Sequence, residues 1–266
     1  MSEKKNITIR EADGGVINME IYTELNSVTA LAREYAKNGY PDRYVVFSEK
    51  QHRHGHEDGF ENGMYMACIL RPSLFPSQAS LLGALSATAL ATALEEHTTA
   101  RLGIGWVSDI YCEGVKIGET SIEGKLDNHT TYEYIIVTFS VKLDSDNFPP
   151  RLSDMIRKVF EVENTSISMI VARGVLNRFF KFYSSMKTSS RFMEIYSKKF
   201  VLRGKTIKFL SDNKKKNCKV LGVDNKTGAL IVETKRGSVE HIISPKSVIM
   251  PKRLHFSGKL LQKTER

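Results

Sequence analysis

The chain has 266 residues, which is enough for one large domain and a second small one. Its apolar fraction of 41% and charged fraction of 26% are those of an ordinary globular protein, and the absence of any apolar run of about 18 residues excludes a membrane-spanning helix. The net charge of +9 is uneven: residues 201–266 hold sixteen Lys and Arg against five Asp and Glu, so this quarter should attract polyanions or an acidic protein.

The N-terminus and the cysteines bear on where the protein works. Residues 1–6 lead into mixed polar sequence without the apolar core of a signal peptide. Cys68, Cys112 and Cys218 are too few and too scattered for a disulfide framework or a zinc site. We therefore expect a cytoplasmic protein with buried structural thiols. An acyl-thioester role for Cys68 or Cys112 is the less favoured interpretation.

The first part of the chain predicts strands interleaved with helices. Helical spacing of apolar residues predicts a helix over 23–37 and another over 76–96, which Ser77 would cap. A polar loop is expected over 49–63. Short apolar or β-branched runs predict strands over 44–48, 64–70, 102–107, 111–116, 121–125 and 134–141.

The remainder is helical and then changes character. Residues 151–200 have a mostly helical pattern, which with the preceding strands indicates an α+β domain. Five short strands separated by Lys-rich or Gly-containing turns follow, which is typical of a small SH3-like barrel. They are expected at 206–210, 218–223, 229–233, 239–243 and 248–250. The chain thus divides into an α+β domain over 1–200, a barrel over 201–251 and a basic tail over 252–266.

The segment Leu102-Gly-Ile-Gly-Trp-Val-Ser-Asp-Ile-Tyr-Cys-Glu-Gly-Val-Lys-Ile-Gly118 carries a specific motif. It resembles the central motif of biotin-protein ligases, which runs Lys-Trp-Pro-Asn-Asp, Ile or Leu, Tyr, two residues, Gly, one residue, Lys, Ile or Leu, Ala-Gly. Glu123 follows where the family carries a Glu. The matching residues are Trp106, Asp109, Ile110, Tyr111, Gly114, Lys116 and Ile117.

Further pieces resemble the same family in the same order, from about residue 17 to residue 250. Asn26 ends a segment similar to the family's Asp-Ser-Thr-Asn helix start, and Gln51 stands where a Gln precedes its Gly-Arg-rich loop. Residues 63–65 and 70–72 resemble its Gly-x-Leu-Tyr strand and its Leu-Arg-Pro ending. Residues 220–230 resemble the Gly-Ile-Asp and Gly-Ala-Leu pieces of its barrel.

This resemblance implies a fold, a reaction and a site. The fold is a mixed-sheet ligase domain followed by an SH3-like barrel. Family members join biotin to ATP as biotinyl-adenylate, with magnesium, and pass biotin to a lysine of a carrier domain. No counterpart of the family's optional DNA-binding domain is recognised, so a repressor role is not expected. The implied pocket residues are Asn26, Gln51, Tyr65, Trp106 and Lys116, and the equivalents of the phosphate loop are Arg53, Gly55 and Gly59.

Several positions depart from the family's pattern where its phosphate chemistry lies. Forming an acyl-adenylate needs positive charge and N–H donors around the α-phosphate. The Gly-Arg-rich loop corresponds to residues 52–59, which keep one arginine and add two carboxylates, and the motif lysine corresponds to Gly105. Lys142 stands at an asparagine of the family. Catalytic residues are therefore unassigned, with Lys116 and Lys142 as candidates, and enzyme activity is left open.

Three individual signals each allow two interpretations. Glu24 replaces a small pocket residue, which is costly beside a ureido group unless the carboxyl is protonated or turned outward. We expect Trp106 to line the pocket, with a core position as the alternative, and Asp109 to support a turn. The histidines at alternate positions 52, 54 and 56 could bind zinc or nickel, or form a histidine-rich surface loop. No metal is assigned to His52, His54 and His56.

Three functions are compatible with these residues. The first is a divergent ligase that attaches biotin or a related carboxylic acid to a carrier-protein lysine through an acyl-adenylate, with ATP and magnesium. The second is a non-catalytic relative that binds an acyl ligand or a carrier. The third is a nucleic-acid-binding protein that uses the basic barrel. An acidic carrier domain would suit the charge of residues 201–266 equally well, and the resemblance leaves a homodimer open.

Overall fold

The computed structural model of the protein describes most of the chain. The described residues are 4–10, 15–52, 60–76, 79–98, 100–127, 131–143, 166–186, 191–211, 214–243 and 248–249. The expected capping residue Ser77, the first part of the helical block 151–200 and the basic tail 252–266 lie outside these ranges.

Eight strands of the described chain form one mixed sheet in the order β1-β2-β3-β4-β8-β7-β6-β5. β2 and β3 run parallel, and the other neighbours are antiparallel. The bounds are β1 Lys4–Arg10, β2 Val16–Leu25, β3 Tyr44–His52, β4 Phe60–Leu70, β5 Leu102–Ile104, β6 Asp109–Cys112, β7 Val115–Leu126 and β8 Tyr132–Lys142.

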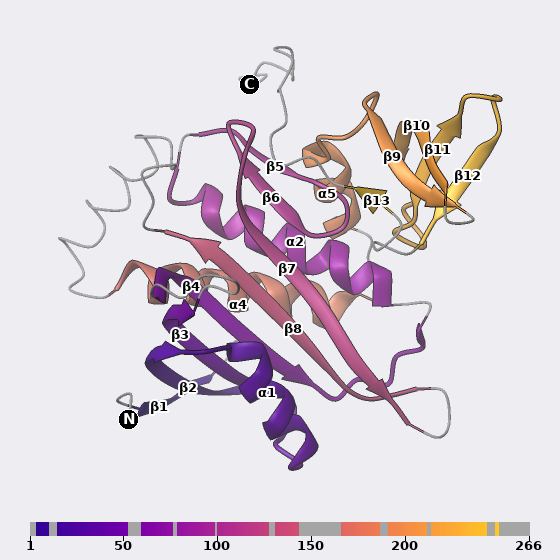
Figure 1. Ribbon diagram of the computed structural model, residues 1–266. Helices are drawn as coiled ribbons and strands as arrows, with labels where there is room; N and C mark the ends of the chain where they lie inside the picture. Colours follow the sequence, from indigo (N-terminus) through magenta and orange to yellow (C-terminus); the bar gives the residue numbers. More distant parts are fainter. Residues whose placement is uncertain are drawn as a thin grey trace.

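Helices cover both faces of this sheet (Figure 1). α1, Val28–Lys37, lies on one face, which is called the α1 face below. α2, Ala79–Glu95, and α4, Ile167–Ser185, cover the opposite face, and α5, Arg191–Lys199, packs against α2. Because alternate residues of a strand point to opposite faces, the strand residues divide between a main core under α2 and α4 and a smaller core under α1.

One of the predicted helices begins later than expected. The helix predicted from residue 23 begins at Val28, because residues up to Leu25 pair with β3 as part of β2. Ser27 caps α1 by accepting a hydrogen bond from the Ala30 N–H at 3.2 Å. α2 is apolar on all sides because it is almost wholly buried. None of the helices in the described ranges is both long and apolar enough to cross a membrane.

Several strand boundaries differ from the predictions; for example, the strand predicted over 102–107 ends at Ile104, and the one predicted over 121–125 begins at Val115. β3 extends to His52 and β4 begins at Phe60, so both strands shorten the polar loop that was predicted over 49–63. The strand predicted over 111–116 is wrong, because Glu113 and Gly114, both with positive φ, form the tight turn between β6 and β7. β1 and β2 were not predicted as strands, although Ile7 and Ile9 of β1 alternate and pack against the main core.

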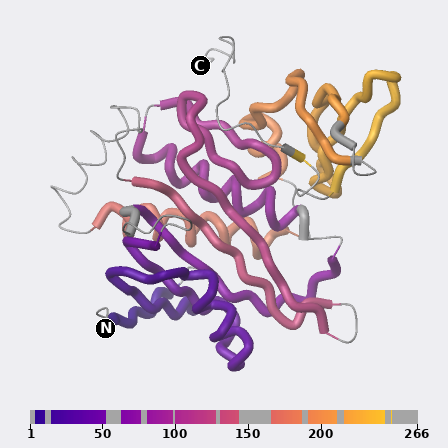
Figure 2. Tube along the Cα trace, in the orientation of Figure 1, coloured from indigo at the N-terminus to yellow at the C-terminus, as the bar shows by residue number. Residues whose placement is uncertain are grey.

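The C-terminal part forms a second, smaller antiparallel sheet in the order β12-β11-β10-β9-β13. Its five strands follow the order that the sequence predicts, except that β10 begins four residues earlier than expected, and the tube in Figure 2 shows them together at one side of the large sheet. They are β9 Thr206–Ser211, β10 Lys214–Val223, β11 Leu230–Thr234, β12 Val239–Ile242 and β13 Val248–Ile249. The α+β class, with a mixed sheet followed by a small barrel-like β unit, is thereby confirmed.

Candidate functional site

A row of polar and charged residues crosses the α1 face of the large sheet. Residues that pair directly across antiparallel strands carry their side chains on the same face. Along the strands β3, β4, β8, β7 and β6 the paired residues are Ser48, Tyr65, Ser140, Glu119 and Asp109. α1 covers the neighbouring rows, whereas the Glu119 side chain, next to the last residue Asp109, is 53% exposed. The row therefore ends at an accessible part of the sheet.

Lys116 holds a charged cluster at this accessible end. Its Nζ lies 2.8 Å from Oδ1 of Asp109 and 2.5 Å from Oε2 of Glu119. The other carboxylate oxygen of Asp109 accepts a long hydrogen bond of 3.4 Å from the Tyr111 hydroxyl. Burial alone would lower the pKa of the Lys116 amine, but its hydrogen bonds to the two carboxylates raise that pKa above its usual value. Lys116 is therefore a fixed positive charge.

The other candidate residues from the sequence lie on the same face, toward the ends of β3, β4 and β8. Lys142 pairs with Gly63 two residues beyond the Ser140–Tyr65 pair. Gly63 must be glycine, because a Cβ there would lie 2.4 Å from the Val141 carbonyl oxygen. Tyr65 is buried, with its ring beneath Gly63.

The start of α1 borders this region. Gln51 accepts the Val28 N–H at 2.9 Å through its side-chain carbonyl, and so helps to satisfy the first turn of α1. Asn26 is exposed in the bend that precedes this helix. Glu24, in β2, is exposed as well, which agrees with the second of its two alternatives, a carboxylate turned outward. The structure therefore brings Gln51, Tyr65, Lys116 and Lys142 to one face, with Asn26 at its border.

Trp106 does not join this group. Its ring is 3% exposed within the main core, and its Nε1–H donates to the carbonyl of Gly228, in the turn between β10 and β11 of the small sheet, at 3.0 Å. Gly105, at the position of the family's lysine, accepts a 3.3 Å hydrogen bond from the Tyr196 hydroxyl through its backbone carbonyl. Trp106 thus connects the loop between β5 and β6 to the turn before β11, and Gly105 connects the same loop to α5.

The loop residues proposed for phosphate and metal lie outside the described ranges, except for one histidine. These residues are Arg53, Gly55, Gly59, His54 and His56. His52 is the last residue of β3 and pairs with Phe60. Within the described ranges no three His, Cys, Asp or Glu side chains are grouped to hold a metal ion. Cys68, Cys112 and Cys218 are all free and buried, as expected of structural thiols.

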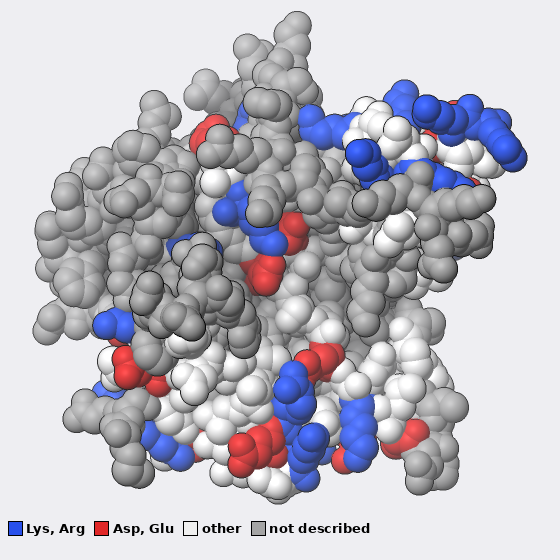
Figure 3. Space-filling model, in the orientation of Figure 1, with Lys and Arg blue, Asp and Glu red and all other residues white. Residues whose placement is uncertain are grey.

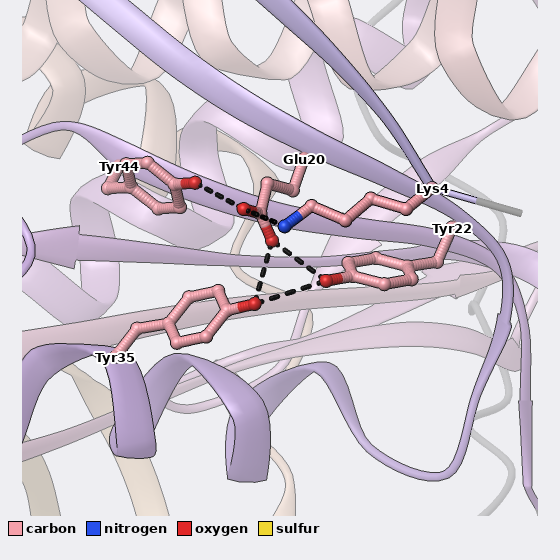
Figure 4. A network of polar contacts seen from close by, with 5 residues as sticks. All are labelled: Lys4, Glu20, Tyr22, Tyr35 and Tyr44. Atoms are coloured by element: carbon pink, nitrogen blue, oxygen red, sulfur yellow. Dashed lines mark hydrogen bonds and ion pairs between the residues drawn. The ribbon is translucent and has the colours of Figure 1, made fainter. Parts of the chain in front are cut away.

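A second charged cluster on the α1 face was not anticipated from the sequence (Figure 4). Glu20 is 3% exposed, and its carboxylate lies 2.6 Å from Nζ of Lys4. It also accepts hydrogen bonds of 2.6–2.8 Å from the hydroxyls of Tyr22, Tyr35 and Tyr44. Burial alone would raise the pKa of the Glu20 carboxyl, but these four donors lower it to about 2. The spacing of Glu20 and Tyr22, two residues apart in one strand, was the available signal.

The small sheet carries many basic side chains. Lys and Arg gather over it in Figure 3, and the exposed ones include Lys208, Lys219, Lys226, Lys235 and Arg236. A shallow pocket of about 200 Å³ opens between β9, β10 and β11, with Lys219, Glu233 and Lys235 in its lining. It is separate from the α1 face of the large sheet, because its lining comes entirely from the small sheet.

Comparison with known proteins adds sequence and structural likenesses. No family model matches the chain. The bifunctional ligase/repressor BirA proteins of Bacillus spizizenii and Bacillus subtilis are each 26% identical to it over 226 residues, which are 80% of this chain and 68% of each relative.

Solved structures share the fold more closely than the sequence. A variant of the Aquifex aeolicus biotin protein ligase in complex with biotin has a TM-score of 0.66 at 19% identity, covering 88% of this chain and 98% of the ligase. A biotin protein ligase-like protein of unknown function from a Silicibacter species has a TM-score of 0.66 at 12% identity, covering 89% and 96%. The motif of residues 102–118, the BirA match and the shared fold agree, so the chain resembles biotin protein ligases in sequence and shares their fold.

Proposed function

We propose that this protein binds biotin or a related carboxylic acid, activates it with ATP as an acyl-adenylate and transfers the acyl group to a lysine of a carrier protein in the cytoplasm. The observation that supports this proposal is the gathering of Lys116, Lys142, Gln51 and Tyr65 on one accessible face beside the start of α1. An acid binds where cations and N–H donors converge on a face that its apolar part can also contact.

The residues divide between those that suit the acid and those that suit the nucleotide. Lys116 and Lys142 would hold negative oxygens of the acid or of the α-phosphate, because fixed cations stabilise charge that develops there. ATP supplies the leaving pyrophosphate when it is bound. Asp109 and Glu119 beside Lys116 would repel a triphosphate unless magnesium lies between them, since carboxylates are magnesium ligands. The described residues therefore fit the acid better than the triphosphate.

A solved structure with a similar fold indicates which ligands to test first. The Aquifex aeolicus ligase has been solved with biotin and ATP together, at a TM-score of 0.60 and 18% identity. Biotin is therefore the first acid to test, and lipoate and octanoate are the alternatives with a similar acyl chain.

Mass spectrometry of the product tests the proposal directly. The full chain is incubated with magnesium-ATP and, separately, with biotin, lipoate or octanoate, and the acyl-adenylate is sought. The expected result is an acyl-adenylate with one of the three acids, which then identifies the substrate. If none forms and calorimetry detects no ATP binding, the ligase proposal is rejected.

A non-catalytic relative that binds the acid alone is the second candidate. Two observations favour it: Gly105 supplies no side-chain cation at the family's lysine position, and Lys116 is already engaged by two carboxylates. Binding of the acid without binding of ATP, measured by isothermal titration calorimetry, would select this candidate over the ligase.

The carrier would approach through the basic small sheet. Its exposed apolar side chains are aliphatic, such as Leu210, Leu221 and Ile243, and its one described Phe, Phe209, is buried. Single-stranded nucleic acids are usually bound on exposed aromatic rings, whereas lysines beside aliphatic side chains suit an acidic protein. An acidic biotin carrier domain should bind with an affinity that falls with salt. Stronger binding of a 30-nucleotide RNA would favour the nucleic-acid function instead.

A further inference from the structure

The contacts of Lys116 differ between its two carboxylate partners. The Asp109 side chain is only 12% exposed, and Lys116 is the cation that neutralises it. The Glu119 side chain is 53% exposed and reaches the same Nζ from the strand β7 that carries Lys116. A buried carboxylate needs its cation, but an exposed one is solvated adequately by water. Asp109 is therefore the structural partner of Lys116, and Glu119 is a second partner that the fold does not require.

The cluster consequently carries one negative charge in excess. One ammonium faces two carboxylates, and the raised pKa of Lys116 keeps the ammonium charged. Glu119 approaches Lys116 from the exposed side of the row, which is also the side open to a ligand. An anionic oxygen that arrives from solvent at Nζ would have to displace the Glu119 carboxylate or lie beside it against its negative charge, because Glu119 already lies 2.5 Å from that atom.

We propose that Glu119 is a specificity-determining residue that guards Lys116: it occupies the place that a ligand's carboxylate or phosphate oxygen would take. This inference rests on the proposed function, in which Lys116 contacts the acid. Its consequence is selective. Glu119 weakens the binding of an anionic ligand and leaves the binding of an uncharged analogue of the same shape nearly unchanged, because only the anion competes for Lys116.

Glu119→Gln separates these effects, and Glu123→Gln is the matched control. Gln keeps the shape of Glu and removes its charge. Glu123 lies on the same strand and face and also forms an ion pair, but with Arg33 of α1. Its neutralisation changes the same charge at a similarly exposed position without touching Lys116. Thermal unfolding of both variants checks that each one is folded.

The first measurement is calorimetric titration at pH 8 with biotin, which is an anion, and with biotin methyl ester, which is uncharged. In Glu119→Gln the affinity for biotin should rise about tenfold or more, since a charge-assisted hydrogen bond to Lys116 becomes available. The affinity for the ester should change less than about twofold. Equal changes for both ligands, or no gain for biotin relative to Glu123→Gln, would overturn the inference.

The second measurement needs no ligand and so separates this inference from the proposed function. The rate at which acetic anhydride acylates Lys116 is followed by peptide mass spectrometry. Losing one adjacent carboxylate should lower the pKa of the amine, so Lys116 of Glu119→Gln should react roughly threefold to tenfold faster than in the wild type or in Glu123→Gln. If no variant binds biotin but Lys116 of Glu119→Gln reacts faster, the proposed ligand is wrong, and the inference that Glu119 holds Lys116 is still supported. An unchanged rate shows that Glu119 does not hold Lys116.

Discussion

The Glu20 cluster and the Lys116 cluster lie on the same face of the large sheet and are built in opposite ways. Glu20 is one buried carboxylate with four donors, and each of its oxygens accepts two of them. Lys116 is one ammonium with two carboxylates, of which one is exposed. The first cluster is neutral as a pair with Lys4 and saturated. The second has an excess of charge that faces solvent.

This difference separates a structural cluster from a site. A buried carboxylate whose oxygens already accept from four donors has no acceptor position left for a ligand, so its contribution is to the free energy of folding. It connects β1, β2, β3 and α1, which supply its five side chains (Figure 4). A cluster with a surplus group can exchange that group for a ligand at little cost to the fold. Variants of each cluster should therefore change different measured quantities.

Lys116→Gln should produce the largest effect, and it should be on activity. If the proposed reaction occurs, the rate of acyl-adenylate formation should fall roughly 10²- to 10³-fold, because a cation at the developing charge is lost. The rate is measured by quenched mass spectrometry. The control is Lys125→Gln. Lys125 lies on β7, like Lys116, and forms an exposed ion pair with Glu133 of β8, so this variant should keep the wild-type rate. Equal losses in both variants would contradict a local role for Lys116.

Glu20→Gln should act on stability and leave the binding of the acid unchanged. It removes the charge that four donors surround, so the free energy of unfolding should fall by roughly 2 to 3 kcal/mol. Urea unfolding followed by circular dichroism measures this loss. Glu123→Gln breaks a partly exposed ion pair and should cost less than about 1 kcal/mol. The distinction between the clusters fails if the acid-binding affinity, and not the stability, changes in Glu20→Gln.

The pH dependence of stability should carry the signature of Glu20. Its pKa is about 2 in the folded chain, below the usual 4.5, so its stabilisation is complete above pH 4.5 and is lost as the pH falls toward 2. Because Lys4 is partly exposed and screened by water, we expect a contribution of about 2 kcal/mol. The wild type should therefore lose its advantage over Glu20→Gln between pH 4.5 and 2 in urea titrations. A constant difference across this range would refute the assignment.

Trp106→Phe should produce the smallest effect and marks where the site ends. The indole N–H loses its bond to the Gly228 carbonyl, so the free energy of unfolding should fall by about 1 to 2 kcal/mol. The affinity for biotin, measured by calorimetry, should stay unchanged because Trp106 lies in the main core. A loss of affinity without a loss of stability would restore Trp106 to the pocket.

Much of the fold follows from local sequence. Apolar runs and turn residues predict most strands of both sheets, and the motif around Trp106 and Lys116 predicts the family's fold. β1 escaped prediction because its only apolar residues, Ile7 and Ile9, are a short signal, and its place in the sheet depends on pairing with β2 and on the contact of Lys4 with Glu20. The start of α1 was misplaced because residues 23–25 fit a helix locally but pair with β3 instead.

The site was predictable only in its residue types. Motif matching identifies Lys116 and Asp109, but the competition between Asp109 and Glu119 for one amine depends on the bulged register of β6 against β7. The position of Trp106 depends on a carbonyl 122 residues further along the chain. The Glu20 cluster joins two strands and a helix to an edge strand. Each of these contacts is long-range, so local patterns carry no information about it.

The contact of Trp106 with Gly228 belongs to a core that runs without interruption from the large sheet into the small one, through residues such as Phe200, Phe209 and Val220. Two units that share a core unfold as one cooperative unit, so the small sheet cannot melt by itself without exposing apolar surface of its neighbour. Repulsion among the crowded lysines of the small sheet then lowers the stability of the whole molecule. Moderate salt, by screening that repulsion, should raise the melting temperature of the entire chain in a single transition.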